Sequence, residues 1–318
     1  MYSMSIKRVG LAVIAGDKDI LIIKVLPHVC PTCPYLIDGL RNTMTLTEAI
    51  KLIKDDNMNY KIYNNNSKDW VLLIHGLGGS IRTWKYQIDD LKEYNVIAVD
   101  LEGHGGSSIR KTRHLLTESA AGINGILEQE GIDQVHIISL SLGTLVAMEF
   151  AHLYKEKVRS IVLAGFVMNL GIGYKTLLAF VEAFKYIIPK RFFYPMFANL
   201  MMPNKNHKKS RDIFIRESLK MTSEAFRMWL TELFRTQFKI KEYYRTIKEN
   251  HLPVFLISGN EDYFFLNSVK KTHREMRESS LCFIEKCGHV CSIEKYELFN
   301  SLVVKFLHGI GTPAIAGV

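Results

Sequence analysis

The chain has 318 residues, of which 47% are hydrophobic and 23% charged, and it carries a formal net charge of +9. This length can bury one large core with an inserted subdomain, and the composition is ordinary for a soluble globular protein. No apolar run approaches the length of a transmembrane helix, and no nucleic-acid-binding motif accompanies the basic charge.

Residues 1–57 precede the main pattern and predict an N-terminal appendage. Two short apolar runs, 9–15 and 20–23, flank a Gly-Asp-Lys-Asp turn, which favours a β-hairpin over a secretory signal peptide. Thr45 followed by Glu48 is the capping-box pattern that opens a short helix. Because the pattern of a signal peptide is the weaker one, we expect a cytoplasmic protein.

Five cysteines, an odd number, agree with a reducing compartment. Cys30 and Cys33 have the two-residue gap of a metal or redox pair, and Cys287 and Cys291 flank His289. A four-cysteine zinc site can be drawn from them, but it would compete with His289 for space, and no other feature requires a metal. We therefore expect free cysteines, with neither a metal nor a cofactor.

From residue 58 onward, apolar strand patterns alternate with helical ones. Strands are expected at 70–74, 96–99, 135–139, 158–163, 254–258 and 281–285, and helices at 82–91, 117–130, 142–154 and 293–307. Such alternation is typical of the α/β class, with a doubly wound, mostly parallel sheet and helices on both faces. The core is therefore assigned to residues 58–165 and 251–318.

The alternation stops in residues 166–250, which show helical periodicity and little strand pattern. We expect a helical cap inserted over the site. Its many Met, Phe and Tyr residues favour a hydrophobic acyl or alkyl substrate, although most of them should form the core of the cap itself. The interval holds 16 Lys and Arg against 7 Asp and Glu. This positive charge has two interpretations: contact with an anionic surface or an acyl carrier protein, or a helix face that is simply solvated.

Residues 137–144 read Ile-Ile-Ser-Leu-Ser-Leu-Gly-Thr and place Ser141 between a strand and a helix. Small residues two positions away on each side, here Ser139 and Gly143, let the two backbones approach. Such a turn lifts the serine oxygen out of the sheet and aims the next N–H at the same point, which presents a nucleophile. The usual pattern has glycine where Ser139 stands, so a more strained turn is expected. The alternative is a serine that only caps the helix.

Acid and histidine candidates follow the two later strands. The first is followed by Gly-Asn-Glu-Asp, in which Asp262 is the preferred acid and Glu261 the neighbouring alternative. The second is followed by Cys-Gly-His, which supplies His289 as the base. His75 and His104 are expected to be turn and loop residues near the site rather than bases.

Two further motifs follow the first strands: His-Gly-Leu-Gly-Gly at 75–79 and Asp-Leu-Glu-Gly-His-Gly-Gly-Ser at 100–107. With nucleophile, acid and histidine in this chain order, residues 58–308 resemble the α/β-hydrolase fold family. The resemblance implies an oxyanion hole made by the backbone N–H groups of Leu77 and Leu142. It implies a catalytic triad of Ser141, Asp262 and His289.

The same resemblance implies a serine hydrolase that cleaves a carboxylic ester or thioester of a hydrophobic substrate through an acyl-enzyme. One alternative is an acyltransferase, which passes the acyl group from the same intermediate to an alcohol or thiol. Another is a ligand-binding or signalling protein of this fold that turns over slowly or not at all. The expected partner is a small hydrophobic molecule, without nucleic acid and without a transmembrane segment.

Overall fold

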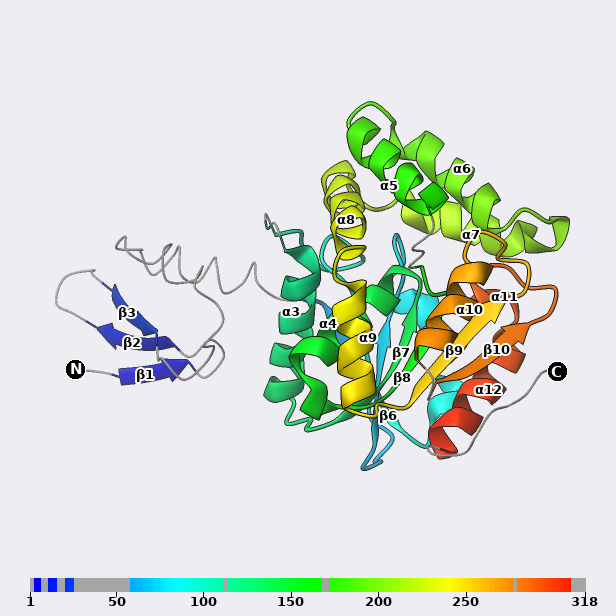
Figure 1. Ribbon diagram of the computed structural model, residues 1–318. Coiled ribbons are helices and arrows are strands. Elements are labelled where there is room, and N and C mark those ends of the chain that lie inside the picture. The colour runs from blue at the N-terminus through cyan, green and yellow to red at the C-terminus, as the bar shows by residue number, and fades with distance from the viewer. Residues whose placement is uncertain are drawn as a thin grey trace. The chain divides into compact units, whose positions relative to one another are not determined.

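The computed structural model describes residues 58–309, apart from 111, 113, 168–171 and 277–278, and the backbone of three strands nearer the N-terminus. The chain divides into two compact units, residues 1–57 and 58–318. The second unit is a sheet flanked by helices, with a further group of helices above one end of the strands (Figure 1).

The first unit contains an antiparallel sheet of three strands. In order they are β1 (Ser3–Ile6), β2 (Leu11–Ala15) and β3 (Leu21–Val25), and Ala15 pairs with Leu21. β2 and β3 correspond to the two apolar runs from which a hairpin is expected. Cys30, Cys33 and the helix expected at Thr45 lie outside the described residues.

Seven strands form the sheet of the second unit, in the order β10-β9-β8-β7-β5-β6-β4. β4 pairs antiparallel with β6 at one edge, and all other neighbours are parallel. The bounds are β4 Tyr60–Tyr63, β5 Trp70–Ile74, β6 Asn95–Val99, β7 Val135–Leu140, β8 Val158–Ala164, β9 Val254–Gly259 and β10 Ser280–Ile284. This arrangement confirms the predicted α/β class with a mostly parallel sheet.

The central strands owe their position to continuous apolar runs. Every residue of β6, β7 and β9 is buried, whereas the edge strand β10 buries only Ile284 fully. Strands of a parallel sheet are covered on both faces, so they need unbroken rather than alternating hydrophobicity. The carboxyl ends of the parallel strands therefore meet at one edge of a well-packed sheet, where loops can carry functional side chains.

Helices flank the sheet. α3 (Leu115–Gln129), α4 (Leu142–Leu153) and α9 (Ile240–Glu249) pack side by side, with α4 in the middle. α10 (Leu266–Glu275) packs against β9, and α11 (Cys291–Glu294) leads into α12 (Tyr296–His308). Phe306 of α12 contacts Phe255 of β9, with 5.3 Å between ring centroids.

The helix expected at 82–91 is wrong as an α-helix. The segment forms two 3₁₀ turns, η1 (Ile81–Trp84) and η2 (Asp89–Leu91), joined by i→i+3 hydrogen bonds such as that from Gln87 N–H to the Trp84 carbonyl. With three residues per turn, Trp84 and Gln87 share one buried face. Gln87 Nε2 then donates to the Ser292 carbonyl at 2.9 Å, which ties the segment to α11.

The regular structure between 166 and 250 is helical in all its described residues. It comprises α5 (Ile172–Phe184), α6 (Lys190–Met201), η4 (Lys205–His207), α7 (Lys208–Ser218), α8 (Ser223–Thr236) and α9. Figure 1 shows α5, α6 and α7 above the ends of the strands, whereas α9 lies beside α4. Tyr243 of α9 donates to the buried Glu149 carboxylate of α4 at 2.7 Å. Among the described helices, none is both long and apolar enough to cross a membrane.

A buried histidine in β7 predicts a loss of stability in acid. Burial, with Arg159 nearby, lowers the pKa of His136 from 6.5 to about 4. As the pH falls below 6.5, the unfolded chain takes up this proton before the folded one, so the free energy of unfolding decreases. Acidification from pH 7 to pH 4.5 should therefore lower the free energy of unfolding by about 2 kcal/mol through His136 alone.

Urea unfolding of wild type and His136→Gln at the two pH values measures the effect, because glutamine can keep the hydrogen bond to the Ser160 hydroxyl but does not titrate. We expect the variant to lose about 2 kcal/mol less than wild type on acidification. His308→Gln, at an exposed position, serves as the control. Equal losses in wild type and His136→Gln would contradict the assignment.

Candidate active site

Ser141 stands at the sharp turn between β7 and α4, with a φ of +53°. The turn is possible because residues without a side chain stand where the neighbouring backbones approach it. A methyl group on Gly143 would overlap the carbonyl oxygens of Ile74 and His75, and one on Gly76 would lie 2.9 Å from Ser141 Cβ. The close approach of the β5 turn to Ser141 therefore depends on these two glycines.

Ser139 occupies the position where the family pattern has glycine. Its side chain is fully buried, and its hydroxyl donates to the Val162 carbonyl of β8 at 2.8 Å. Its backbone keeps the regular pairing of β7 with β8, opposite Leu163. The Ser139 hydroxyl thus has a hydrogen-bond partner in the sheet, and the sharp turn begins only at Ser141.

Three side chains predicted from the sequence come together at the carboxyl ends of the strands. His289 Nε2 lies 2.8 Å from Ser141 Oγ, and His289 Nδ1 lies 2.7 Å from Asp262 Oδ2. His289 and Asp262 are fully buried, while Ser141 is half-buried. With the carboxylate accepting from Nδ1–H, Nε2 keeps its lone pair for the serine hydroxyl.

The two loops that carry the acid and the histidine are joined by their backbones. Glu261 N–H donates to the Cys287 carbonyl at 2.9 Å, and Asn260 N–H to the Ile284 carbonyl at 2.9 Å. The His289 imidazole rests on Gly165, where a methyl group would lie 3.2 Å from the ring carbon Cε1. Because that site is a glycine with a φ of +53°, the ring can approach the chain after β8.

The N–H groups of Leu77 and Leu142 lack a protein acceptor among the described residues. Leu142 is the first residue of α4, where a helix leaves N–H groups without intrahelical partners. Within the described part of the chain, neither N–H donates to a protein group. The approach of Gly76 to Ser141 brings the turn that contains Leu77 beside the same serine.

Asp100 holds the turn after β5 and the loop after β6 together. Its buried carboxylate accepts from Ile81 N–H at 2.7 Å, Gly106 N–H at 2.8 Å and the Asn59 amide at 2.6 Å. A methyl group on Gly105 would overlap this carboxylate. The Asp-x-x-Gly-His-Gly-x-Ser motif is therefore a structural brace, since these donors replace the water that a buried carboxylate loses.

His75 and His104 brace the same loops as neutral rings. His75 Nε2 accepts from Leu101 N–H at 3.0 Å, and His104 Nε2 accepts from Gly78 N–H at 3.0 Å. Each Nδ1 faces a backbone carbonyl, that of Gly76 or Glu102. Burial lowers the pKa of both rings. With both nitrogens engaged, neither histidine has a lone pair to offer a substrate.

Cys287 and Cys291 are buried thiols on either side of His289, and burial raises the pKa of each. They are therefore neutral thiols. The described residues contain no cluster of three or more side chains suited to a metal ion.

A second polar cluster, which the sequence did not reveal, joins the cap to the loops of the site. The fully buried His207 lies 2.6 Å from Glu294 Oε1 through Nδ1 and 3.1 Å from Glu261 Oε2 through Nε2. Glu261, the alternative acid, thus faces the cap, and Asn206 also donates to it at 2.8 Å. These residues come from three distant segments, so no local pattern could have indicated the contact.

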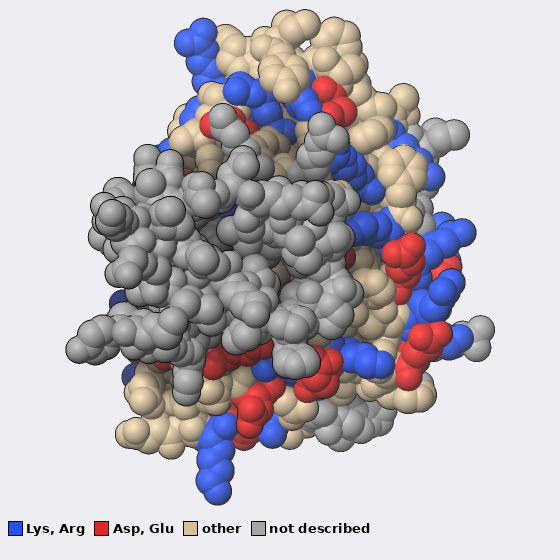
Figure 2. Space-filling model, turned by 90° about the vertical axis from the view of Figure 1, so that its left-hand side faces the viewer, with Lys and Arg blue, Asp and Glu red and all other residues tan. Residues whose placement is uncertain are grey.

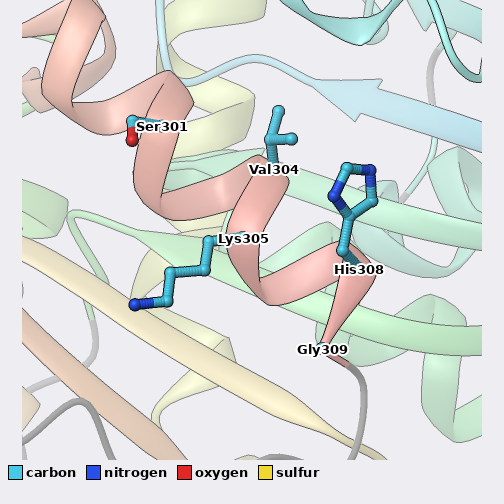
Figure 3. A pocket seen from close by; sticks show the side chains of 5 residues that line it. All are labelled: Ser301, Val304, Lys305, His308 and Gly309. Atoms are coloured by element: carbon cyan, nitrogen blue, oxygen red, sulfur yellow. The ribbon is translucent and has the colours of Figure 1, made fainter.

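A pocket of about 500 Å³ lies along the last turns of α12. Figure 3 shows that Val304 and His308 point to one side of the helix and Lys305 to another. All five lining residues come from α12 or the residue that follows it, and none belongs to the cluster around Ser141.

Comparison with known proteins gives a consistent match. Residues 69–296 match the family described as the alpha/beta hydrolase fold. Over 246 residues the chain is 26% identical to the dihydrolipoyllysine-residue acetyltransferase component of the acetoin cleaving system of Cupriavidus necator, with 75% of this chain and 63% of that relative covered. It therefore spans less than two thirds of that relative's length.

Another relative is matched almost in full. It is a 2-hydroxy-6-oxononadienedioate/2-hydroxy-6-oxononatrienedioate hydrolase of Burkholderia vietnamiensis, 24% identical over 304 residues, with 86% of this chain and 99% of the hydrolase covered. A solved carboxylesterase structure from Nitrososphaera gargenis has 21% identity and a TM-score of 0.66, and covers 79% of this chain and 94% of its own. These matches confirm the predicted fold.

The buried cluster at His207 predicts a stability contribution that surface ion pairs lack. Replacing His207 by leucine leaves Glu261 and Glu294 facing an apolar side chain, which should cost about 2 to 3 kcal/mol of unfolding free energy. His308→Leu removes the exposed pair with Glu93 and should cost less than about 0.5 kcal/mol. Urea unfolding of both variants at pH 7 compares them, and equal costs would contradict the structural role of His207.

Proposed function

Since the chain belongs to the family of the alpha/beta hydrolase fold, we propose that it is a serine hydrolase acting on a carboxylic ester or thioester. The observation that carries the proposal is the line of hydrogen bonds from Ser141 Oγ to His289 Nε2 and from His289 Nδ1 to Asp262 Oδ2, at 2.8 and 2.7 Å. A serine, a histidine and a carboxylate in this geometry form the arrangement that makes a hydroxyl nucleophilic at neutral pH.

In the proposed first step, Ser141 Oγ attacks the carbonyl carbon while its proton passes to His289 Nε2. The imidazolium that forms is stabilised by Asp262, whose second oxygen, Oδ1, has no hydrogen-bond partner among the described residues. Collapse of the tetrahedral intermediate expels the alcohol or thiol, which takes the proton from His289, and leaves an acyl group on Ser141.

The oxyanion of that intermediate is assigned to the N–H groups of Leu77 and Leu142. Leu142 N–H also stands at the positive end of the α4 dipole, which favours a developing negative charge. Donors that are already oriented need no reorganisation during the reaction, and the loss of one such donor typically lowers kcat by about 10² to 10³. Water, activated by His289, then hydrolyses the acyl-enzyme and regenerates Ser141.

A hydrophobic acyl or alkyl group is the proposed substrate class, because the cap is rich in apolar side chains and one of them, Met202, contacts the loop that carries His289. Met202 is fully buried, and a methyl group on Gly288 would lie 3.0 Å from its Cγ. Met221 is also buried at the start of the segment leading into α8. Methionine side chains form adaptable apolar walls.

Water is the proposed acceptor, although one relative is named as an acetyltransferase component. That relative is covered over 63% of its length, whereas the hydrolase of Burkholderia vietnamiensis is covered over 99%. Adding alcohols during turnover distinguishes the two reactions by the ratio of new ester to free acid. A transfer product that dominates at low alcohol concentration would favour the acyltransferase.

The free thiols of Cys282, Cys287 and Cys291 support a reducing, cytoplasmic location for either enzyme.

Labelling with a fluorophosphonate probe tests the nucleophile. Wild type should be labelled and Ser141→Ala should not, and the variant should lose at least about 10³-fold in kcat/KM on p-nitrophenyl esters. Ser139→Ala is the matched control, because this neighbouring serine donates to the sheet, and it should keep its label. Labelling of folded Ser141→Ala at the wild-type level would refute the assignment.

A series of p-nitrophenyl esters tests the apolar acyl pocket. Each added methylene that is buried contributes about 0.8 kcal/mol, or roughly a fourfold gain in kcat/KM, until the pocket is full. We therefore expect butyrate and longer esters to exceed acetate. The prediction fails if acetate is the best substrate and decanoate is inert.

A further inference from the structure

One short stretch of the cap exposes an unusual amount of apolar surface. The described residues contain twelve large hydrophobic side chains that are exposed, and seven of them fall between 180 and 200. We call these seven residues the apolar cap segment: Phe180, Phe184, Tyr186, Ile187, Phe192, Met196 and Leu200. They lie on α5, on α6 and on the connection between them, and Figure 1 shows these two helices above the ends of the strands of the second unit.

The pattern on α6 distinguishes this surface from scattered exposure. Phe192, Met196 and Leu200 follow each other at intervals of four, so they form one outward stripe along the helix. The opposite side of α6 is apolar as well, because Phe193 and Tyr194 are buried in the cap. A helix that is apolar on both sides has a second apolar environment, either protein or lipid.

The connection between α5 and α6 is the most exposed part of the segment. Tyr186 and Ile187 are 77% and 71% exposed, and Phe192 follows with 61%. Side chains of this size standing free in water are unusual at one tip of a globular protein.

Positive charge surrounds the same side chains. Lys175, Lys185, Lys190 and Arg191 lie in α5 and α6 and their connection, against the single carboxylate of Glu182. Lys185 pairs with Glu182 at 2.6 Å and Lys190 donates to the Leu219 carbonyl, so Lys175 and Arg191 are the exposed cations of this set. The Arg191 guanidinium lies 5.1 Å from the Phe192 ring centroid, and that of Arg227 lies 5.3 Å from the Tyr186 ring centroid. Figure 2 shows Lys and Arg side chains, with a few Asp and Glu side chains, among uncharged surface in the upper part of the view.

The positive charge around the apolar cap segment indicates which kind of partner suits this surface. Aromatic and aliphatic side chains with cations beside them suit the boundary of an anionic bilayer, where rings enter the headgroup layer and Lys and Arg remain at the phosphates. A second copy of the same surface would bring its cations against these, which disfavours self-association. We propose that the apolar cap segment docks the protein onto an anionic lipid surface. This goes beyond the proposed function, because docking requires no catalysis.

Flotation of the full chain with lipid vesicles tests the proposal. We expect at least a tenfold higher partition coefficient with vesicles containing about one third phosphatidylserine than with pure phosphatidylcholine, since each cation near such a surface contributes about a fivefold gain. Added salt should weaken the binding, because it screens the charges. If the protein floats with neither kind of vesicle, the proposal is overturned.

Variants localise the contact. Ile187→Ser combined with Phe192→Ser should lower the partition coefficient at least tenfold without changing the melting temperature, since both side chains are exposed. Phe238→Ser is the matched control, because Phe238 is 72% exposed but lies just beyond α8, outside the segment. Arg191→Glu should weaken binding to phosphatidylserine vesicles, whereas Lys241→Glu on α9 should have less effect.

Two results would assign the surface differently. Vesicle binding that the double variant retains would place the lipid contact elsewhere, and a concentration-dependent dimer in wild type that the double variant loses, without vesicle binding, would identify a second copy as the occupant. Ser141→Ala separates this question from the reaction, because it should bind vesicles like wild type while losing hydrolysis of soluble esters.

Discussion

The site depends on one close approach of two backbones, where the turn after β5 passes the turn after β7. Neither Gly76 nor Gly143 could carry a side chain there, since a methyl group on either would meet Ser141 or the carbonyls of the β5 turn. This contact brings the turn that contains Leu77 beside Ser141, and Leu142 begins α4. The position of Ser141 is thus set by backbone geometry, and the side chains around it brace the neighbouring loops.

Most of the titratable groups near this contact are neutral. Asp100 receives three donors, so a buried carboxylate braces two loops without a cation. His75 and His104 are neutral and fully engaged, and the nearby thiols of Cys287 and Cys291 are neutral as well. Among these neighbours, His289 is left as the group with a lone pair directed at Ser141. His207 of the cap also contacts Glu261, next to Asp262, and Glu294 of α11.

Much of this arrangement could be predicted from the sequence, because the signals are local. Continuous apolar runs identified the parallel strands, and small residues beside Ser141 identified the turn. The order of Ser141, Asp262 and His289 indicated the fold, which the structure and the comparisons confirm; their catalytic roles stay a prediction. The expected helix at 82–91 was wrong, because Asp100 and Gln87 bind this segment to distant loops and favour 3₁₀ turns that periodicity could not reveal. Sequence periodicity also could not tell which stripe of α6 faces outward, since both are apolar.

Trapping the acyl-enzyme shows whether Ser141 is the nucleophile. Rapid acid quenching during turnover of a p-nitrophenyl ester, followed by mass spectrometry of the digested protein, reports any covalent intermediate and its position. We expect a mass increase equal to one acyl group on Ser141, formed in a burst with one equivalent of p-nitrophenol. Turnover without such an adduct under conditions where deacylation is slow, or an adduct on another residue, would contradict this role of Ser141.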